Sequence, residues 1–233
     1  MPNLSERIQI LESEIATAAK KSGRRAQDVT LVAVSKTYEA EHVRAAIKCG
    51  LTNFGENYVQ EALPKIHEVA DPAIHWHFVG HLQSNKVKSI VGKFAMIHSI
   101  DSFSTAEELS KRVDQDPDVN EPQKILIEVN LGEEPTKTGI LLSQLHPLLD
   151  KIQDLPYVQI CGLMAMPPLD WQPEELRRAY NHFRDERDRL ASQITAPHSL
   201  VELSMGTSHD FSEAIQAGAT MVRIGTRIFG ERK

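Results

Sequence analysis

The sequence has few cysteines, no long apolar run and no excess of positive charge. Its two cysteines, Cys49 and Cys161, are too few and too far apart to form a disulfide framework. No apolar stretch approaches the roughly 20 residues of a membrane-spanning helix, and the N-terminus lacks the basic start and apolar core of a signal peptide. The formal net charge is −6 and the basic residues are dispersed, which argues against a nucleic-acid-binding surface. We therefore expect a soluble cytoplasmic protein that binds neither membranes nor nucleic acids.

The composition is that of one folded domain. Apolar residues make up 41% and charged residues 25% of the 233 residues, so the chain can bury a sizeable core. Apolar residues recur from Leu4 to Phe229, with no linker, internal repeat or low-complexity stretch between them. The sequence therefore predicts a single domain over residues 1–233, a length typical of a one-domain barrel.

Short β-branched runs alternate with longer amphipathic runs along the chain. Before these runs, an amphipathic segment from Leu4 to Ala18 predicts a helix. Asn3 and Glu6 can form a capping box at its start, and Gly23 ends it. Strands are predicted at Val29–Ser35, Thr52–Gly55, His75–Val79, Met96–Ile100, Ile125–Asn130, Gln159–Met164, Leu200–Ser204 and Met221–Ile224. Helices are predicted between them at Ala40–Cys49, Val59–Val69, Thr105–Val113, Leu141–Gln153, Pro173–Gln193 and Phe211–Ala217. This alternation predicts an α/β fold, a single (β/α)8 TIM-type barrel with an extra N-terminal helix, and a doubly wound open sheet is the alternative.

Polar residues and glycines follow the predicted strands at their carboxyl ends, where barrels place their functional sites. Lys36 comes directly after the apolar run Val32–Val34 and Ser35. Burial at this position would disfavour the charged form of Lys36 and lower its pKa. A neutral lysine amine attacks an aldehyde readily. The alternative is a lysine that extends to solvent from the rim.

Two loops near the end of the chain predict an anion site. The segment Ser204–Ser208 reads Ser-Met-Gly-Thr-Ser and precedes a helix, and its hydroxyl groups and the helix amides can hold an anion, with Gly206 permitting close backbone approach. Gly225-Thr226 follows the eighth strand, and the loops after strands seven and eight form the usual phosphate site of a barrel. The alternative for the first loop is a purely structural capping box of Asp210 and Glu213.

Arg223 lies within the last predicted strand, where an arginine needs a partner. It could contact a phosphate group or face a ring nitrogen. It could instead form an ion pair with a strand-end carboxylate such as Glu202 or Glu128. The sequence by itself leaves these three interpretations open.

Histidines in the third strand raise the question of a metal site. His75 and His77 share one face of the strand and His81 follows shortly afterwards, whereas a catalytic zinc site needs three such ligands and an open position. Gly80 redirects the chain before His81 and no acidic residue in the segment completes the set, so we expect no metal. His77 or His81 could stack on or hydrogen-bond to a ligand, or the histidines could be satisfied within the barrel or at its rim.

Five segments of the chain together carry a resemblance to a known family: Val32–Thr37, Asn53–Asn57, Trp76–Lys86, Gly162–Met166 and Val222–Thr226. In their order and spacing they resemble the pyridoxal phosphate homeostasis protein family, also called the proline-synthetase-co-transcribed family. The resemblance covers almost the whole chain.

The resemblance implies a fold-type-III barrel that binds pyridoxal 5′-phosphate (PLP), similar to the N-terminal domain of alanine racemase. It implies an internal aldimine on Lys36, a ring-nitrogen contact from Arg223, and Asn57 in the lining of the pocket. The phosphate contacts would fall on Ser204, Ser208, Gly225 and Thr226. The cofactor-binding residues that we expect are therefore Lys36, Asn57, Ser204, Gly206, Ser208, Arg223, Gly225 and Thr226.

One position departs from the family pattern, in which the strand-seven loop usually reads Ser-Met-Gly-Met-Ser. Here the fourth position is Thr207, which has a side chain of moderate size and an added hydroxyl group. We expect the anion site to survive this change, which affects only local packing.

The function that the resemblance implies is management of PLP and of amino- and keto-acid pools, by a monomer without established substrate turnover. Its expected partners are PLP and PLP-dependent apoenzymes. The enzymatic alternative is a small PLP-dependent racemase or decarboxylase. A further alternative is a phosphate-sugar aldolase or isomerase that uses Lys36 without a cofactor.

Overall fold

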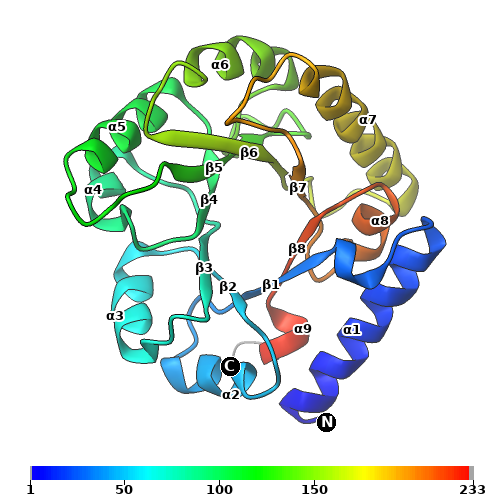
Figure 1. Cartoon of the computed structure of the whole chain (residues 1–233). Coiled ribbons are helices and arrows are strands. Elements are labelled where there is room, and N and C mark those ends of the chain that lie inside the picture. Colours follow the sequence, from blue (N-terminus) through cyan, green and yellow to red (C-terminus); the bar gives the residue numbers. More distant parts are fainter. Residues whose placement is uncertain (1, 231–233) are drawn as a thin grey trace.

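Eight parallel strands close into a barrel in which each strand pairs with the next and the last pairs with the first (Figure 1). The computed structural model describes residues 2–230. The strands are β1 (Thr30–Val34), β2 (Asn53–Glu56), β3 (His75–Phe78), β4 (Met96–Ile100), β5 (Gln123–Val129), β6 (Val158–Ala165), β7 (Glu202–Ser204) and β8 (Met221–Ile224). The predicted barrel is confirmed. The open doubly wound sheet is wrong, because β1 pairs with β8 instead of lying at an edge.

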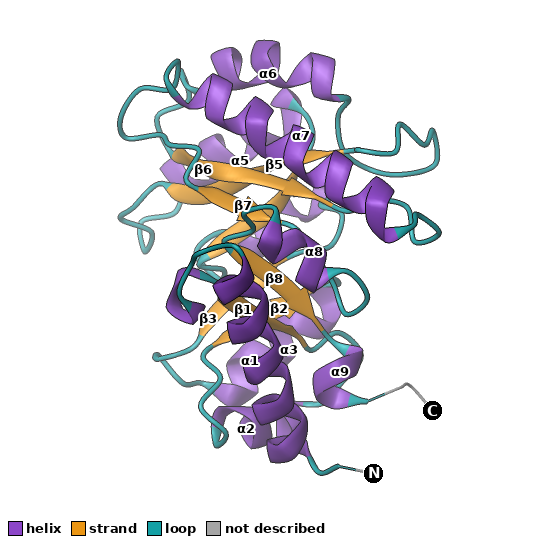
Figure 2. Ribbon diagram, turned by 90° about the vertical axis from the view of Figure 1, so that its right-hand side faces the viewer, coloured by secondary structure: helices purple, strands orange, loops and turns teal. Residues whose placement is uncertain are grey.

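The helices lie outside the strands and form an outer layer (Figure 2). They are α1 (Leu4–Lys21), α2 (Ala40–Ile47), α3 (Val59–Val69), α4 (Val87–Ile90), α5 (Phe103–Asp114), α6 (Leu145–Ile152), α7 (Pro173–Ala191), α8 (Phe211–Gln216) and α9 (Thr226–Phe229). Short 3-10 turns occur at Ala26–Asp28, Ser84–Lys86 and Leu142–Gln144. Among residues 2–230, none of the helices combines the length and the apolar character needed to cross a membrane.

The extra N-terminal helix begins with the predicted capping box. The side-chain oxygen of Asn3 accepts the N–H of Glu6 at 3.0 Å, and the Glu6 carboxylate accepts the N–H of Asn3 at 2.9 Å. The helix ends before Gly23, which has a φ of +72° that glycine adopts without strain. Ile8 and Leu11 are buried on the face of α1 that packs against α8 and α9.

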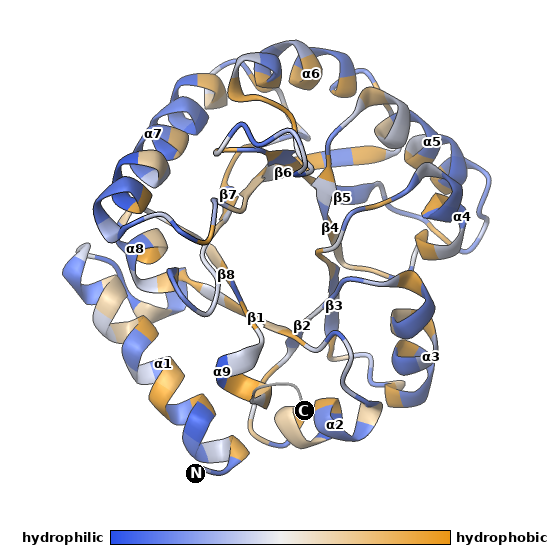
Figure 3. Ribbon diagram, turned by 180° about the vertical axis from the view of Figure 1, so that it is seen from behind, coloured by the Kyte–Doolittle hydropathy of each residue, from blue (hydrophilic) through white to orange (hydrophobic). Residues whose placement is uncertain are grey.

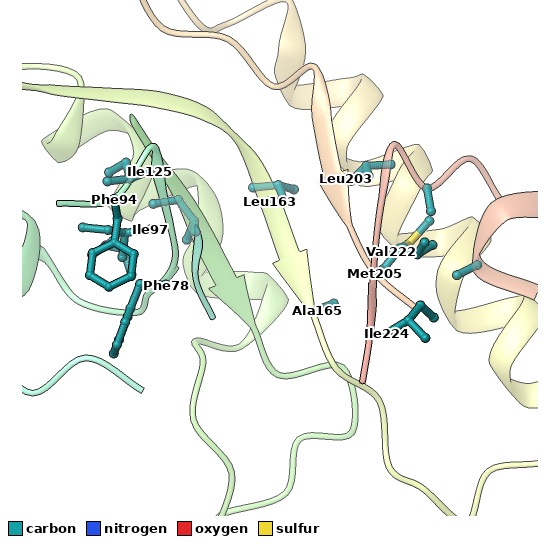
Figure 4. Close-up of a cluster of buried hydrophobic side chains, with 14 of the residues drawn as sticks. Phe78, Phe94, Ile97, Ile125, Leu163, Ala165, Leu203, Met205, Val222 and Ile224 are labelled. Carbon is teal, nitrogen blue, oxygen red and sulfur yellow. The ribbon is translucent and has the colours of Figure 1, made fainter. Parts of the chain in front are cut away.

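Successive side chains along each strand point alternately out of the barrel and into it. The outward set packs against the helices, and Figure 4 shows part of it: Phe78, Ile97, Ile125, Leu163, Leu203 and Val222. A separate apolar cluster inside the barrel contains Met96, Leu126, Cys161, Met164 and Met221. Burial of one such aliphatic side chain stabilises the fold by about 1.5–3 kcal/mol, so the two clusters together hold the barrel and its helices in place.

Helix α7 illustrates how the outer layer is specified. Figure 3 shows it as largely hydrophilic, as expected for a helix with one face in solvent. Its buried residues are Leu176, Tyr180, Phe183 and Leu190, whose spacing of four, three and seven positions places them on one face of the helix. Pro173 occupies the first turn, where its missing N–H costs no hydrogen bond.

The predicted strands agree with the observed strands to within two residues at every end. The helix that we expected at Leu141–Gln153 starts later, because its first residues form a 3-10 turn before α6 begins at Leu145. Helices α4 and α9 have no predicted counterpart. Each has four residues, which is too short for a 3.6-residue period to show in the sequence.

Candidate functional site

A cavity of about 370 Å³ is lined by residues at the carboxyl ends of β1, β2, β3, β6, β7 and β8. Six of the expected site residues line it: Lys36, Asn57, Ser208, Arg223, Gly225 and Thr226. Seven further residues line it that the sequence analysis did not assign to the site: Val34, Tyr38, Val79, Met166, Leu169, Thr207 and His209. Ser204 and Gly206 are not part of the lining. The cavity is the size of a typical small-molecule site, with apolar walls and a few polar groups.

Lys36 lies directly beyond the end of β1 and is half-buried. Its neighbour Thr37 has a φ of +68°, in the left-handed region that a β-branched residue rarely occupies. Such a conformation costs on the order of 1–3 kcal/mol, and the Glu61 carboxylate on α3 holds it by accepting the Thr37 N–H at 2.9 Å. Backbone strain is therefore stored next to Lys36.

A buried ion pair supports the other side of Lys36. Lys65 on α3 and Glu56 on β2 are 6% and 0% exposed, with 2.6 Å between Nζ and Oε1. Lys65 also donates to the carbonyl of Ser35 at 2.8 Å, and the Ser35 hydroxyl donates to the Glu56 carboxylate at 2.6 Å. Burial raises the pKa of Glu56, although Lys65 and the Ser35 hydroxyl act in the opposite direction. The peptide group before Lys36 is thus anchored from inside the fold.

Gly80 brings the loop that carries Asn57 to the cavity. A Cβ atom at Gly80 would lie 2.2 Å from the carbonyl oxygen of Asn57, so only glycine allows β3 and the β2 loop to approach this closely. Within residues 2–230, the side-chain oxygen of Asn57 is buried without a hydrogen-bond partner. Asn57 therefore presents an unsatisfied acceptor at the cavity wall.

The loop after β7 is held by Asp210, which lies at the start of α8. One Asp210 oxygen accepts the N–H and the hydroxyl of Thr207 at 2.6 and 2.9 Å, and the other accepts the hydroxyl of Tyr180 on α7 at 2.5 Å. The Asp210 side chain makes no capping hydrogen bond to α8, so the capping box with Glu213 is not formed. Gly206 packs closely against α8, since a Cβ there would lie 2.6 Å from the Cβ of Ala214, and it is not part of the cavity lining.

Ser204 lies beneath the cavity, inside the barrel. It is fully buried, and its hydroxyl oxygen is 2.9 Å from Nδ1 of His98 and 2.7 Å from Nη1 of Arg223. Ser204, which the sequence analysis expected among the phosphate contacts, is thus engaged inside the barrel and is not part of the cavity lining.

Arg223 forms the floor of the cavity and is buried. Its guanidinium donates to the carbonyl of Ser204 at 2.7 Å and to the carbonyl of Ala165 at 3.0 Å, in addition to the Ser204 hydroxyl. Burial lowers the pKa of Arg223, which nevertheless remains a cation.

The carboxylates that could have paired with Arg223 have other partners. Glu202 accepts a hydrogen bond from Thr220 at 2.5 Å, and Glu128 accepts one from Thr138 at 2.6 Å. Neutral oxygens therefore orient Arg223, and the ion pair that the sequence left open as one interpretation is not formed.

The histidines of the third strand do not share one site. His77 is buried, with its ring nitrogens 2.9 Å from Nε2 of His98 and 3.1 Å from the side-chain oxygen of Asn53. His81 lies at the rim, 3.6 Å from the Asp101 carboxylate. Throughout residues 2–230, no three His, Cys, Asp or Glu side chains come together as a metal site requires.

Burial keeps the two inner histidines neutral. It lowers the pKa of His77 to about 4, with a smaller contribution from His75. It lowers the pKa of His98 well below its usual range, and His77 and Arg223 act in the same direction. At neutral pH each ring therefore has one donor and one acceptor nitrogen.

Comparison with known proteins identifies the family. Residues 10–233 match the family described as alanine racemase, N-terminal domain. A pyridoxal phosphate homeostasis protein from Aquifex aeolicus is 42% identical over 233 residues, which cover 99% of this chain and 99% of the relative. This chain belongs to the pyridoxal phosphate homeostasis protein family.

Solved structures agree with membership of the pyridoxal phosphate homeostasis protein family. The structure of PipY from Synechococcus elongatus with PLP bound is 35% identical with a TM-score of 0.84, over 98% of this chain and all of that chain. Alanine racemase from Corynebacterium glutamicum has a TM-score of 0.66 at 15% identity and covers 95% of this chain and 61% of that one. The second likeness shows the fold alone.

The sequence analysis did not identify His98 and Tyr180, two buried residues that support the site. His98 had a detectable signal, because it lies two residues after Met96 on a predicted strand and therefore faces the same side. Tyr180 lies within the predicted helix Pro173–Gln193, and nothing in the sequence connects it with Asp210.

The lowered histidine pKa values predict how stability depends on pH. Between pH 6.5 and about 4, the unfolded protein protonates His77 while the folded protein does not, so the free energy of unfolding falls as pH decreases. His77→Gln should reduce this fall by an amount approaching about 1.4 kcal/mol per pH unit. Urea unfolding of the unliganded protein at several pH values between 7 and 4.5 measures the difference.

Comparison of the unsubstituted protein with His77→Gln isolates the contribution of His77 to the pH dependence. The raised pKa values of Glu56 and Glu128 make the free energy of unfolding rise as pH decreases, but they do so in both proteins. The exposed His182 provides the control, and His182→Gln should leave the pH dependence unchanged. Identical pH dependence in the unsubstituted protein and His77→Gln would contradict the prediction.

Proposed function

We propose that this chain binds PLP in the cavity at the barrel mouth and serves in intracellular PLP homeostasis and in amino- and keto-acid balance. The observation that carries this proposal is that the fold brings Lys36, Arg223 and Ser208 from three distant segments into one cavity. The PLP-bound structure of the relative PipY supports it. We also infer a cytoplasmic monomer of one domain, residues 1–233, that serves PLP-dependent apoenzymes.

The residues present fit the cofactor. The cavity of about 370 Å³ is large enough for a ligand of this size. The buried oxygen of Asn57, which lacks a partner within residues 2–230, can accept a hydrogen bond from a ligand hydroxyl. Val34, Val79 and Met166 provide apolar surface for a flat ring.

The roles of the polar residues follow from their positions. Thr207 donates both its N–H and its hydroxyl to Asp210, so we assign the phosphate contacts of this loop to Ser208. Gly225 and Thr226 line the same cavity from the loop after β8 and complete the phosphate set. Arg223 lies on the floor and would face the ring nitrogen.

Lys36 is the residue that we assign to covalent attachment. When bound, PLP supplies an aldehyde that condenses with an amine, with loss of water. Lys36 lines the cavity on the turn that Glu61 and Lys65 hold from α3, so its amine is carried by a rigid part of the fold.

The tyrosines favour a binding protein over a racemase. A racemase needs a second acid–base group on the opposite face of the ligand from the lysine. Tyr38 is the tyrosine that lines the cavity, and its hydroxyl donates to the carbonyl of Gly230 at 2.8 Å. The Tyr180 hydroxyl donates to Asp210, while Tyr58 and Tyr157 are exposed. No tyrosine is therefore poised for proton transfer, and we expect no efficient turnover.

The first test concerns Lys36. The unsubstituted protein with PLP should show an absorbance band well beyond the protein region, and borohydride should fix the cofactor to Lys36. Lys36→Ala should abolish the aldimine absorbance and the covalent attachment, because the amine is lost, while the phosphate contacts retain some cofactor non-covalently. Lys20→Ala, an exposed substitution on α1, is the control and should leave the band unchanged. An unchanged aldimine band in Lys36→Ala, with the same amount of PLP fixed to the protein by borohydride, would refute the assignment.

The second test concerns the phosphate contacts. The protein should bind PLP far more tightly than pyridoxal, because each hydrogen bond to a charged group contributes about 1.5–3 kcal/mol. Ser208→Ala should weaken PLP binding by roughly tenfold and leave pyridoxal binding unchanged, since one such bond is lost. Titrations of both compounds measure this, with Ser5→Ala on α1 as the control. Equal affinity of the unsubstituted protein for PLP and pyridoxal would exclude a phosphate site.

The third test concerns turnover. Chiral chromatography of alanine and serine incubated with the PLP-loaded protein should show no efficient racemisation, because a missing acid–base group costs about 10²–10⁴-fold in rate. A rate on the order of one turnover per second, within the ordinary enzyme range and abolished by Lys36→Ala, would establish the racemase alternative instead.

A further inference from the structure

Five polar side chains form a line across the interior of the barrel. They come from five different strands: Asn53 on β2, His77 on β3, His98 on β4, Ser204 on β7 and Arg223 on β8. Each neighbouring pair is within hydrogen-bond distance, from 2.7 to 3.1 Å. Neither histidine lines the cavity, and neither has a role in the proposed binding of PLP.

The chemistry of the end residue sets the direction of every hydrogen bond in this line. Arg223 has donors and no acceptor, so the Ser204 hydroxyl oxygen accepts from Nη1 at 2.7 Å. The single hydroxyl proton of Ser204 is then directed to Nδ1 of His98, which accepts it at 2.9 Å. A neutral His98 that accepts on Nδ1 carries its proton on Nε2.

The same reasoning continues to the far end of the line. Nε2–H of His98 donates to Nδ1 of His77 at 2.9 Å, so His77 also carries its proton on Nε2. That proton is donated to the side-chain oxygen of Asn53 at 3.1 Å. Every N–H or O–H donor in the line therefore meets an acceptor. The line ends at the side-chain oxygen of Asn53, an atom that can only accept a hydrogen bond.

A second proton on either ring would break the line. On His77, it would place the new Nδ1–H opposite the Nε2–H of His98. On His98, it would turn Nδ1 into a donor that faces Ser204. Burial opposes that proton, as does the positive charge of Arg223. The line is therefore stable only with both rings neutral and in one tautomer.

We infer that His77 and His98 are positioning residues, which hold the Ser204 hydroxyl in one orientation and thereby hold the Arg223 guanidinium in one orientation at the cavity floor. Three of the five N–H donors of Arg223 are used by Ser204 and Ala165. The guanidinium is thus tied down on its buried side. The remaining N–H donors of Arg223 then point in a constant direction toward a ligand in the cavity. That this ligand is PLP rests on the proposed function.

The first experiment needs no cofactor. Nitrogen-15 NMR of the unliganded protein at pH 7 should show two neutral histidines in the Nε2–H tautomer, assigned by their loss in His77→Gln and His98→Asn. The Arg223 guanidinium should show separate, slowly exchanging Nη signals, because its rotation is hindered. His98→Phe, which removes the acceptor for Ser204, should merge these signals.

The second experiment measures ligand binding in the same variants. His98→Phe should weaken both PLP and pyridoxal by about tenfold, because Arg223 contacts the ring that both compounds share. Their affinity ratio should stay unchanged, unlike in Ser208→Ala. His98→Asn keeps an acceptor at the position of Nδ1 and should restore both the affinities and the Nη signals. The exposed His182→Asn is the control.

The outcomes separate this inference from the proposed function. A protonated or Nδ1–H ring at pH 7 would overturn the inference, and so would unchanged Nη signals in folded His98→Phe. Failure of the unsubstituted protein to bind PLP would refute the proposed function, while the NMR result would still decide the role of the histidines. If His98→Phe does not fold, the Nη signals of Ser204→Ala decide, because they should merge when the hydroxyl link is removed.

Discussion

Closure of the eight-stranded sheet is the constraint on which the rest of the structure depends. A closed barrel has no edge, and strand geometry directs alternate side chains into an enclosed interior. Met96, Leu126 and Met221 form an apolar layer there, and the residues two positions later on the same strands are His98, Glu128 and Arg223. A polar layer therefore lies between the apolar interior and the mouth, where water cannot satisfy every group.

The way this polar layer is satisfied explains why it supports a site. A buried charge is costly unless it is hydrogen-bonded, and a buried histidine avoids the cost by staying neutral. Arg223 is held by the carbonyls of Ser204 and Ala165 and by one hydroxyl group. All three of these hydrogen bonds go to neutral oxygens, so none of them pairs the guanidinium charge with a carboxylate.

The mouth itself is held from the helix layer. Glu61 and Lys65 on α3 fix the peptide groups on either side of Lys36, and Tyr180 on α7 fixes the β7 loop through Asp210. The departure from the family motif at Thr207 fits this scheme, because the added hydroxyl donates to Asp210 and strengthens the same anchor. The barrel is shared with alanine racemase at 15% identity, so the fold tolerates wide sequence change, whereas these anchors depend on particular side chains.

The sequence by itself determined the strands, the long helices, the barrel class and six of the thirteen residues that line the cavity. Those features depend on local periodicity and on the rule that parallel strands place their carboxyl ends together, which is why Lys36, Ser208 and Thr226 could be assigned in advance. Only the tertiary structure decided that Ser204 and Gly206 are not part of the cavity lining, and that His98 contacts both His77 and Ser204. Such contacts join residues more than 20 positions apart through the barrel interior. Their distances depend on strand register and closure, which no local pattern encodes.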